Sequence, residues 1–181
     1  MSLRKTCAVV GGGTMGADIA LTLARAGNPT HVVETFDAVR QGLPARLAEL
    51  ERLPGILGQV YRDAQAPALE QAREFLSASL LYCVAAGPLA GLAYKFALTV
   101  FMENIRVHGS FIESGELRHG PIEAFERQRP DMVFLLGTDE SRAMTERSLA
   151  TSREAGARTL VLDASAYPPV HPLLTPFVLL I

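Results

Sequence analysis

Short apolar runs alternate with an amphipathic stretch in the first part of the chain. Apolar runs at residues 6–10 and 31–34 predict two strands, and the stretch 17–26 between them predicts a helix that ends at Gly27. A strand, a helix and a second strand in succession are typical of a βαβ unit, in which the strands pair in parallel through a right-handed crossover. Residues 1–45 are therefore expected to form a Rossmann-like βαβ segment.

Residues 36–73 follow a different pattern, rich in Leu, Ala, Glu, Arg and Gln. The apolar positions Leu47, Leu50 and Leu53 recur at helical spacing. Three prolines interrupt the stretch: Pro44, Pro54 and Pro67. Because proline removes a helical hydrogen bond and crowds the preceding turn, we expect several helical pieces rather than one rod. Residues 46–77 are therefore predicted to form a helical connector.

From residue 78 onward, continuous apolar runs alternate with helical patterns. Strands are predicted over 80–84, 107–112, 132–136, 159–162 and, at the end of the chain, 177–181. Helices are predicted over 89–104, 121–125 and 142–154, the last with Gly156 as its stop. Strands that are apolar along their whole length are typical of parallel sheets covered on both faces. The expected fold class is α/β, with three layers: a mainly parallel sheet and helices on both of its faces.

Composition and charge narrow the choice of function. The chain has 181 residues, enough for a core that stands alone, and 49% of them are hydrophobic. A net charge of −2 offers no basic field for a nucleic acid. Charge or glycine breaks each apolar run before it reaches the length of a membrane span, and no secretory signal pattern is visible. We therefore expect a cytoplasmic protein whose two cysteines, Cys7 and Cys83, are buried reduced thiols.

The loop over residues 113–121 carries two carboxylates, an arginine and a histidine between turn residues. Its histidine, His119, is of the residue type best suited to proton transfer near neutral pH. Glu103 closes the predicted helix 89–104, and we expect a carboxylate on its buried side that partners His119. Plainer interpretations also stand: Glu103 as a helix-surface carboxylate, and His119 as a loop residue that only makes hydrogen bonds.

The other charged residues of this loop have two interpretations each. Glu113 and Glu116 fit loop carboxylates that pair with Arg118 better than they fit catalytic bases. Arg118 is suited to hold a phosphate or a carboxylate, and a surface salt bridge is the plainer alternative.

Several short motifs follow one another in a fixed order along the predicted elements. They are VAAGPL (84–89), YK (94–95), ME (102–103), HG (108–109), IESGELRHGP (112–121), FLLGTDESR (134–142) and TER (145–147). In this order, the set resembles the second half of proteins of the SIS (sugar isomerase) domain family, over about residues 53–181. The nearest branch is that of fructosamine-6-phosphate deglycases and glucosamine-6-phosphate isomerising enzymes. The resemblance implies an SIS-like, flavodoxin- or Rossmann-like domain over residues 78–181.

The resemblance also implies a reaction. Glu103 matches the family's general base, which takes a proton next to the carbonyl or imine carbon of an open-chain amino sugar. The enediol or enaminol that results gives an isomerised sugar or loses the amine. His119 matches the histidine that assists ring opening, sometimes from a neighbouring subunit. The implied ligand is a phosphorylated sugar or amino sugar, the implied assembly is a homodimer or higher homo-oligomer, and the chemistry needs no metal and no redox cofactor.

Substrate binding is expected at the turns that follow the predicted strands. The candidates are Ala86, Gly87, Glu113, Ser114, Arg118, Thr138 and Ser141. The family's Ser/Thr-rich phosphate cradle belongs to the first SIS half, which this sequence does not contain. In the corresponding turn, Asp139 and Glu140 would repel a phosphate, so helix capping by Thr138 and Asp139 is the favoured interpretation.

Two departures from the family pattern suggest an impaired site. Phe96 stands where the family often carries a glutamate. The sequence ends at Ile181, before the C-terminal helix and tail that usually complete the fold, so we expect a C-terminally truncated domain.

The start of the chain carries a second motif. Gly11, Gly13 and Gly16 follow one predicted strand and open a helix, and Glu34 ends the next strand, as in a dinucleotide fingerprint. Residues 6–45 resemble the NAD-binding start of 3-hydroxyacyl-CoA dehydrogenases. Half a Rossmann unit does not normally enclose a dinucleotide, so the alternative is a tight turn that only packs an extra βαβ unit.

Three functions therefore stand side by side. The first is an isomerase or deglycase acting on a phosphorylated amino sugar of the fructosamine 6-phosphate type. The second is a non-catalytic module that binds carbohydrate derivatives, favoured by Phe96 and the missing phosphate cradle. The third is an NAD-dependent oxidoreductase resembling 3-hydroxyacyl-CoA dehydrogenase, favoured by the glycine motif alone.

Overall fold

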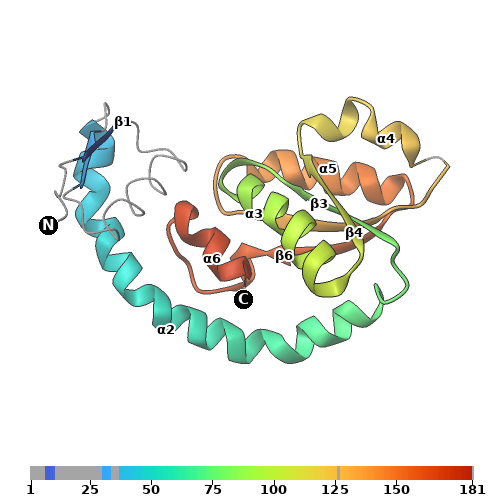
Figure 1. Cartoon of the computed structure of the whole chain (residues 1–181), viewed down its shortest axis with the longest axis horizontal. Coiled ribbons are helices and arrows are strands. Elements are labelled where there is room, and N and C mark those ends of the chain that lie inside the picture. The colour runs from blue at the N-terminus through green and yellow to red at the C-terminus, as the bar shows by residue number, and fades with distance from the viewer. Residues whose placement is uncertain (1–6, 11–29, 34–36, 126, 181) are drawn as a thin grey trace, which may run out of the picture. The chain divides into compact units, whose positions relative to one another are not determined.

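The computed structural model describes residues 7–10, 30–33, 37–125 and 127–180 (Figure 1). The chain divides into two compact units, residues 1–48 and 49–181. In the first unit, strand β1 (Cys7–Val10) pairs in parallel with β2 (Thr30–Val33). The predicted parallel pairing is thus confirmed. The predicted helix 17–26 and the fingerprint residues Gly11, Gly13, Gly16 and Glu34 lie outside the described residues.

Helix α2 (Asp37–Arg73) is one continuous element of 37 residues. Figure 1 shows it as an unbroken ribbon, and its sequence includes Pro44, Pro54 and Pro67. The expectation of separate helical pieces was therefore wrong. A proline removes one hydrogen bond and crowds one carbonyl, which bends a helix without ending it when the neighbouring turns hold. In the second unit, Leu53 and Val60 of α2 are buried against Val178.

Four parallel strands form the sheet of the second unit, in the order β4-β3-β5-β6. They are β3 (Leu80–Ala85), β4 (His108–Glu113), β5 (Asp131–Leu136) and β6 (Arg158–Asp163). The register sets Ala85 opposite Glu113 and Leu136 opposite Asp163, so the four strands end at one edge of the sheet. We call this the carboxyl edge, and the opposite one the amino edge.

The connections between the strands are helical. They comprise η1 (Gly87–Leu89), α3 (Ala90–Lys95), the π-helix η2 (Phe96–Ile105), η3 (Glu116–Arg118), α4 (Pro121–Ala124) and α5 (Arg142–Glu154). After β6 come η4 (Ala164–Ala166), η5 (Pro172–Leu174) and α6 (Thr175–Leu180). The predicted helix 89–104 therefore exists as η1, α3 and η2 in succession, and α5 has the predicted bounds.

Helices cover both faces of the sheet, as the apolar strands predicted. Cys83 and Leu135 point to the face that α3, η2 and α6 cover, where they belong to one buried cluster with Phe101 of η2. Val84 and Phe134 point to the other face, where α5 and the segment after α4 pack. Side chains of successive residues alternate between the faces because a strand has a period of two. The α/β fold with a parallel sheet is thus confirmed, and burial raises the pKa of the Cys83 thiol, as expected of an inert core cysteine.

The last apolar run forms a helix, α6, so the strand predicted over 177–181 was wrong. Val178 and Leu179 are buried while Phe177 is exposed, a one-sided pattern that suits a helix. Pro176 stands in the first turn, where a missing N–H costs no hydrogen bond. A run of five apolar residues is too short for periodicity to separate helix from strand.

Candidate functional site

The turns at the carboxyl edge hold most of the candidate substrate-binding residues. Strand β3 has β4 on one side and β5 on the other, so the chain reverses its direction of travel across the sheet at the β3–β5 boundary. In open α/β sheets, ligands bind in the crevice outside the strand ends at such a switch point. The turns that follow β3 and β5 are therefore the first place to look for a site.

Asp139 belongs to the turn that follows β5 and lies next to Gly87, in the turn that follows β3. Its Oδ1 accepts hydrogen bonds from the backbone N–H of Ser141 at 2.9 Å and from the Ser141 hydroxyl at 2.6 Å. Gly87 has a φ of +56°, and a Cβ there would lie 3.0 Å from Asp139 Oδ1 and would collide with Ser141 Oγ. The two turns thus lie in close contact, and both this contact and the positive φ favour glycine at position 87.

This contact changes the expected role of the β5–α5 turn. The Ser141 hydroxyl is engaged by Asp139, and Ser141, the residue before α5, makes no side-chain capping bond. Asp139 bonds the backbone N–H of Ser141, so it stabilises the turn that leads into the helix but does not cap α5. The expected capping of α5 by Thr138 and Asp139 was therefore wrong. Thr138 is exposed and lines a cavity of about 300 Å³ beside Ala164 and Thr175. Ala86 is buried.

Ser114 faces the interior rather than the crevice. Its side chain is only 2% exposed, and its Oγ lies 2.9 Å from the Thr145 Oγ1 of α5. Glu113, the last residue of β4, accepts a hydrogen bond from the backbone N–H of Gly115 at 2.6 Å. In this structure both side chains therefore shape the loop that follows β4.

Arg118 and His119 are exposed at the end of this loop. Arg118 Nη2 donates to Thr151 Oγ1 at 2.7 Å, so the expected pairing of Arg118 with Glu113 and Glu116 is wrong. Glu116 instead faces the histidine, with its Oε2 3.3 Å from His119 Nδ1. The side chain of Arg118 is long enough to extend from the loop to Thr151 of α5. Glu116 lies three residues before His119 in the same turn, which places its carboxylate beside the imidazole.

Glu103 lies at the other end of the sheet. It belongs to the last turn of η2, which ends at Ile105 just before β4 begins at His108. A crossover helix between parallel strands must return to the amino edge, so β4 separates Glu103 from the His119 loop. The side chain of Glu103 is exposed. The expectation of a buried-side carboxylate paired with His119 within one chain is therefore wrong.

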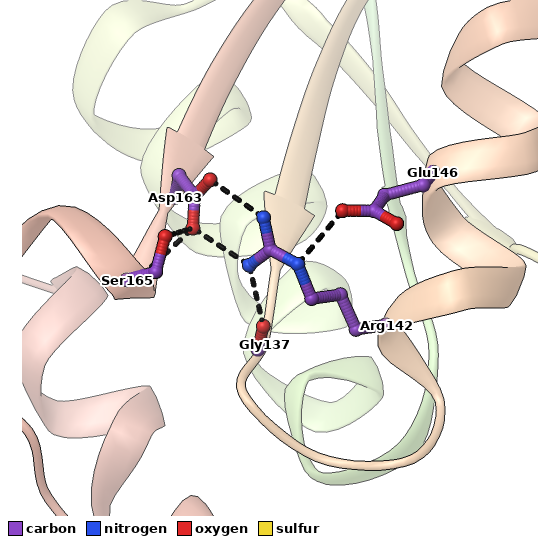
Figure 2. Close-up of polar contacts among 5 residues, drawn as sticks. All are labelled: Gly137, Arg142, Glu146, Asp163 and Ser165. Carbon is purple, nitrogen blue, oxygen red and sulfur yellow. Dashed lines mark hydrogen bonds and ion pairs between the residues drawn. The ribbon is translucent and has the colours of Figure 1, made fainter.

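Arg142 was missed from the sequence, although it makes four polar contacts at the carboxyl edge (Figure 2). Its Nη1 and Nη2 donate to the two carboxylate oxygens of Asp163, each at 2.8 Å. Nη1 also donates to the Gly137 carbonyl and Nε to Glu146 Oε1, both at 2.8 Å. The arginine thus joins the ends of β5 and β6. No local pattern signals this pair, because its members lie 21 positions apart.

The charges of the Arg142–Asp163 pair stabilise each other. The hydrogen bonds from Arg142 lower the pKa of the Asp163 carboxyl well below its usual range, and two bonds from Ser165 act in the same direction. The bonds to Asp163 in turn raise the pKa of Arg142. Both charges are therefore present at every physiological pH, and the guanidinium is occupied rather than available to a phosphate.

Replacing Asp163 with asparagine is expected to lower the free energy of unfolding at pH 7 by about 1.5–3 kcal/mol, the usual worth of a charged hydrogen bond. Because folding lowers the pKa of Asp163, its contribution is full above the unfolded-state pKa of about 4 and is lost as the pH falls toward the folded-state value. The difference between wild type and Asp163→Asn in urea unfolding should therefore shrink below about pH 5. As a control, Glu70→Gln breaks the exposed Arg73–Glu70 pair and should change stability little. A difference in the free energy of unfolding that stayed the same as the pH fell would contradict the prediction.

Among the described residues, no three or more His, Cys, Asp and Glu side chains gather in a way that would hold a metal ion. None of the helices described there is long and apolar enough to cross a membrane.

The amino-acid sequence of the chain is similar to those of two named deglycases. The chain is 38% identical over 134 residues to the fructoselysine 6-phosphate deglycase of Escherichia coli K12, which covers 74% of this chain and 39% of the relative. It is 36% identical over 115 residues to a fructosamine deglycase of Bacillus subtilis, covering 61% of this chain and 35% of that protein. The chain thus spans about two fifths of the length of these relatives.

Solved structures support the fold. A Bacillus subtilis protein assigned as a phosphosugar isomerase matches with a TM-score of 0.65 and 23% identity, over 96% of this chain and 67% of its own. The C-terminal domain of a glucosamine-fructose-6-phosphate aminotransferase from Francisella tularensis matches with a TM-score of 0.60 and 19% identity, over 77% and 43%. At these identities the likeness concerns the architecture alone.

A family model also matches the start of the chain. Residues 6–51 match the model described as pyridine nucleotide-disulphide oxidoreductase. The description shares a pyridine nucleotide with the class expected from the glycine motif, but it names a different class of enzyme from the 3-hydroxyacyl-CoA dehydrogenases.

Proposed function

Because this chain belongs, over about residues 53–181, to the SIS (sugar isomerase) domain family in its deglycase branch, we propose that it acts on a phosphorylated amino sugar of the fructosamine 6-phosphate type. The observation that carries the proposal is the 38% identity over 134 residues to fructoselysine 6-phosphate deglycases. An exposed carboxylate at Glu103 and an exposed imidazole at His119 agree with it, since both are accessible to a ligand.

The proposed reaction is a proton transfer followed by loss of the amine. Glu103 takes a proton from the carbon that bears the nitrogen, next to the carbonyl of the open-chain sugar, and an enaminol forms. Return of the proton to the former carbonyl carbon gives an imine, which water hydrolyses to an aldose phosphate and a free amine. His119 assists the earlier ring opening by moving a proton at the ring oxygen. These steps require neither a metal nor a redox cofactor.

The positions of the two residues favour a site that is shared between two copies of the chain. Glu103 is at the amino edge and His119 at the carboxyl edge, so one site can use both only if they come from different copies. Helix α3 begins near the carboxyl edge and η2 ends at the amino edge. Packing these helices antiparallel across a two-fold axis would carry Glu103 of one copy toward the carboxyl edge of its partner.

An exposed apolar surface on the same helices fits this arrangement. The side chains of Tyr94, Leu98 and Met102 are 40–57% exposed and follow one another at spacings of four residues. Large apolar side chains gathered on one surface are typical of an interface. A second copy of this chain is the proposed occupant, because the proposed site is incomplete without it.

Mixing two inactive variants is expected to restore activity. Glu103→Gln and His119→Ala, refolded together, should form dimers of which half are mixed, and each mixed dimer should hold one intact site. Release of amine and glucose 6-phosphate from a fructosamine 6-phosphate should therefore return to about a quarter of the wild-type rate, while each variant alone stays inactive. If the wild-type protein turned over the substrate under conditions where light scattering shows only monomers, the shared site would be refuted.

Binding of the sugar phosphate without turnover is the second candidate function. The Ser141 hydroxyl is engaged by Asp139, and Phe96 packs edge-to-face on Phe101 with ring centroids 5.9 Å apart, in place of the carboxylate that family members often carry. Both observations favour a site with fewer polar groups for catalysis. Calorimetric binding of a fructosamine 6-phosphate with no amine release would decide for this candidate.

The family match at residues 6–51 favours a third candidate, the binding of NAD or a related pyridine nucleotide by the first unit. Titration of the whole chain with NADH tests it directly, by quenching of the nicotinamide fluorescence or by calorimetry. The absence of binding at millimolar NADH would exclude it.

A further inference from the structure

The inward face of helix α5 carries hydroxyl side chains where a core usually holds apolar ones. Thr145, Ser148 and Ser152 follow at spacings of three and four residues, and all three are buried. Burying a hydroxyl costs about 1–3 kcal/mol unless it finds a hydrogen-bond partner. The partners of these hydroxyls therefore show what the helix is built to hold.

Two of the buried hydroxyls bond the first residue of the loop that follows β4. Thr145 Oγ1 lies 2.9 Å from Ser114 Oγ, and Ser148 Oγ donates to the Ser114 carbonyl at 2.7 Å. The backbone N–H of Ser114 donates to the Ala85 carbonyl at 2.9 Å. All polar groups of Ser114 are thus engaged, which fixes the start of the loop between β3 and α5.

The far end of the loop is bonded to the same helix. Thr151, two turns along α5 from Thr145, accepts a hydrogen bond from Arg118 Nη2 at 2.7 Å and donates to the Arg147 carbonyl at 3.0 Å. Between the two bonded ends, Leu117 is fully buried in the core beneath the loop. His119 follows Arg118 directly, and its exposed imidazole is the first side chain beyond this anchored segment.

We propose that Thr145, Ser148 and Thr151 are positioning residues, which hold the His119 loop on α5 so that the imidazole keeps one place at the carboxyl edge. The proposal rests on the proposed function for the role of His119, and on the hydrogen bonds alone for the anchoring. The hydroxyls bond the loop rather than fill space, since alanine or valine would pack these positions without any need for a polar partner.

Ser152 supplies a matched control on the same helix face. Its Oγ is buried and has no hydrogen-bond partner among the described residues. Ser152→Ala therefore removes a buried hydroxyl without removing a bond to the loop. Thr145→Val removes the hydroxyl at nearly constant volume, and Thr145→Ser keeps it. Thr151→Val, at a less buried position, tests the other end of the loop with little risk to folding.

The experiment measures hydrogen exchange of the backbone amides over 114–119 in the whole chain, together with kcat and KM for a fructosamine 6-phosphate. In Thr145→Val and Thr151→Val we expect the loop amides to exchange about tenfold faster, which corresponds to the loss of one hydrogen bond. We expect kcat to fall by a similar factor while KM changes less than about twofold, since His119 serves proton transfer rather than binding. Thr145→Ser should restore both values, and Ser152→Ala should change neither.

The two readouts fail separately. Unchanged exchange over 114–119 in both valine variants would overturn the anchoring, whatever the activity. Faster exchange with an unchanged kcat would overturn the positioning role of Thr145 and Thr151, whose hydroxyls the two valine variants remove. If the wild type releases no amine, the proposed function fails, and the exchange rates still decide whether α5 anchors the loop. A similar loss in Ser152→Ala would show that general packing, and not the bonded hydroxyls, holds the loop.

Discussion

Replacing Glu103 with glutamine is expected to lower the turnover of a fructosamine 6-phosphate by about 10²- to 10⁴-fold, the usual contribution of a general base. The amide has nearly the size of the carboxylate but cannot accept the proton from the substrate carbon. Glu103 is exposed, so the change should leave the fold and its stability intact. The measurement is the release of glucose 6-phosphate and free amine, with kcat separated from KM, and circular dichroism as the check on folding.

A matched control for this variant lies on another helix. Glu154 is also an exposed carboxylate in the last turn of a helix, α5, and no proposed step uses it. Glu154→Gln should therefore retain the wild-type rate. If Glu103→Gln also retained it, the proton would have to be taken by another group, and the assignment carried over from the family would fail at this position.

The fold was predictable where burial acts on a whole segment. Strands β3 and β5 are buried along most of their length, so their apolar runs are continuous and easy to recognise. Helix α5 ends as predicted before Gly156, whose φ of +83° is a left-handed conformation that favours glycine. In each case a local pattern and the surrounding packing require the same structure.

Prediction failed where distant parts of the chain decide. Arg142 and Asp163 lie 21 positions apart, and Ser114 lies 34 positions from Ser148, so no window of sequence reveals either contact. Helix α2 continues through its prolines because its turns on either side hold, which the proline rule alone does not consider.

The separation of Glu103 from His119 is a different kind of case, because the sequence contained enough to predict it. The sequence predicts a strand, a crossover helix and a parallel strand, and that order returns the end of the helix to the amino edge. Nearness in sequence, 16 positions here, suggested nearness in space. The topology overrides that suggestion, and it is the reason that a shared site between two copies enters the proposed function.

Replacing Gly109 with alanine is expected to destabilise the second unit by about 1–3 kcal/mol or more, as overpacking of a close contact does. Gly109 is the second residue of β4, and η2 crosses it with its backbone. A Cβ at this position would collide with the carbonyl oxygen of Ala97 and lie 2.9 Å and 3.0 Å from its carbonyl carbon and Cα. A side chain could rotate away, but a backbone can yield only if the helix moves off the sheet. Urea unfolding followed by circular dichroism measures the loss.

Gly91 provides the contrast that isolates this cause. It lies in α3, the helix that continues into η2, and a Cβ there would meet no atom within 4 Å. Gly91→Ala should therefore stabilise the chain by about 0.5–1 kcal/mol, because alanine is the better helix former. If Gly109→Ala unfolded at the same urea concentration as the wild type, the backbone of Ala97 in η2 would not pack directly against Gly109 of β4. Glu103 belongs to η2, so the contact between η2 and β4 also fixes the position of the proposed base. A folded Gly109→Ala variant should therefore lose turnover as well as stability.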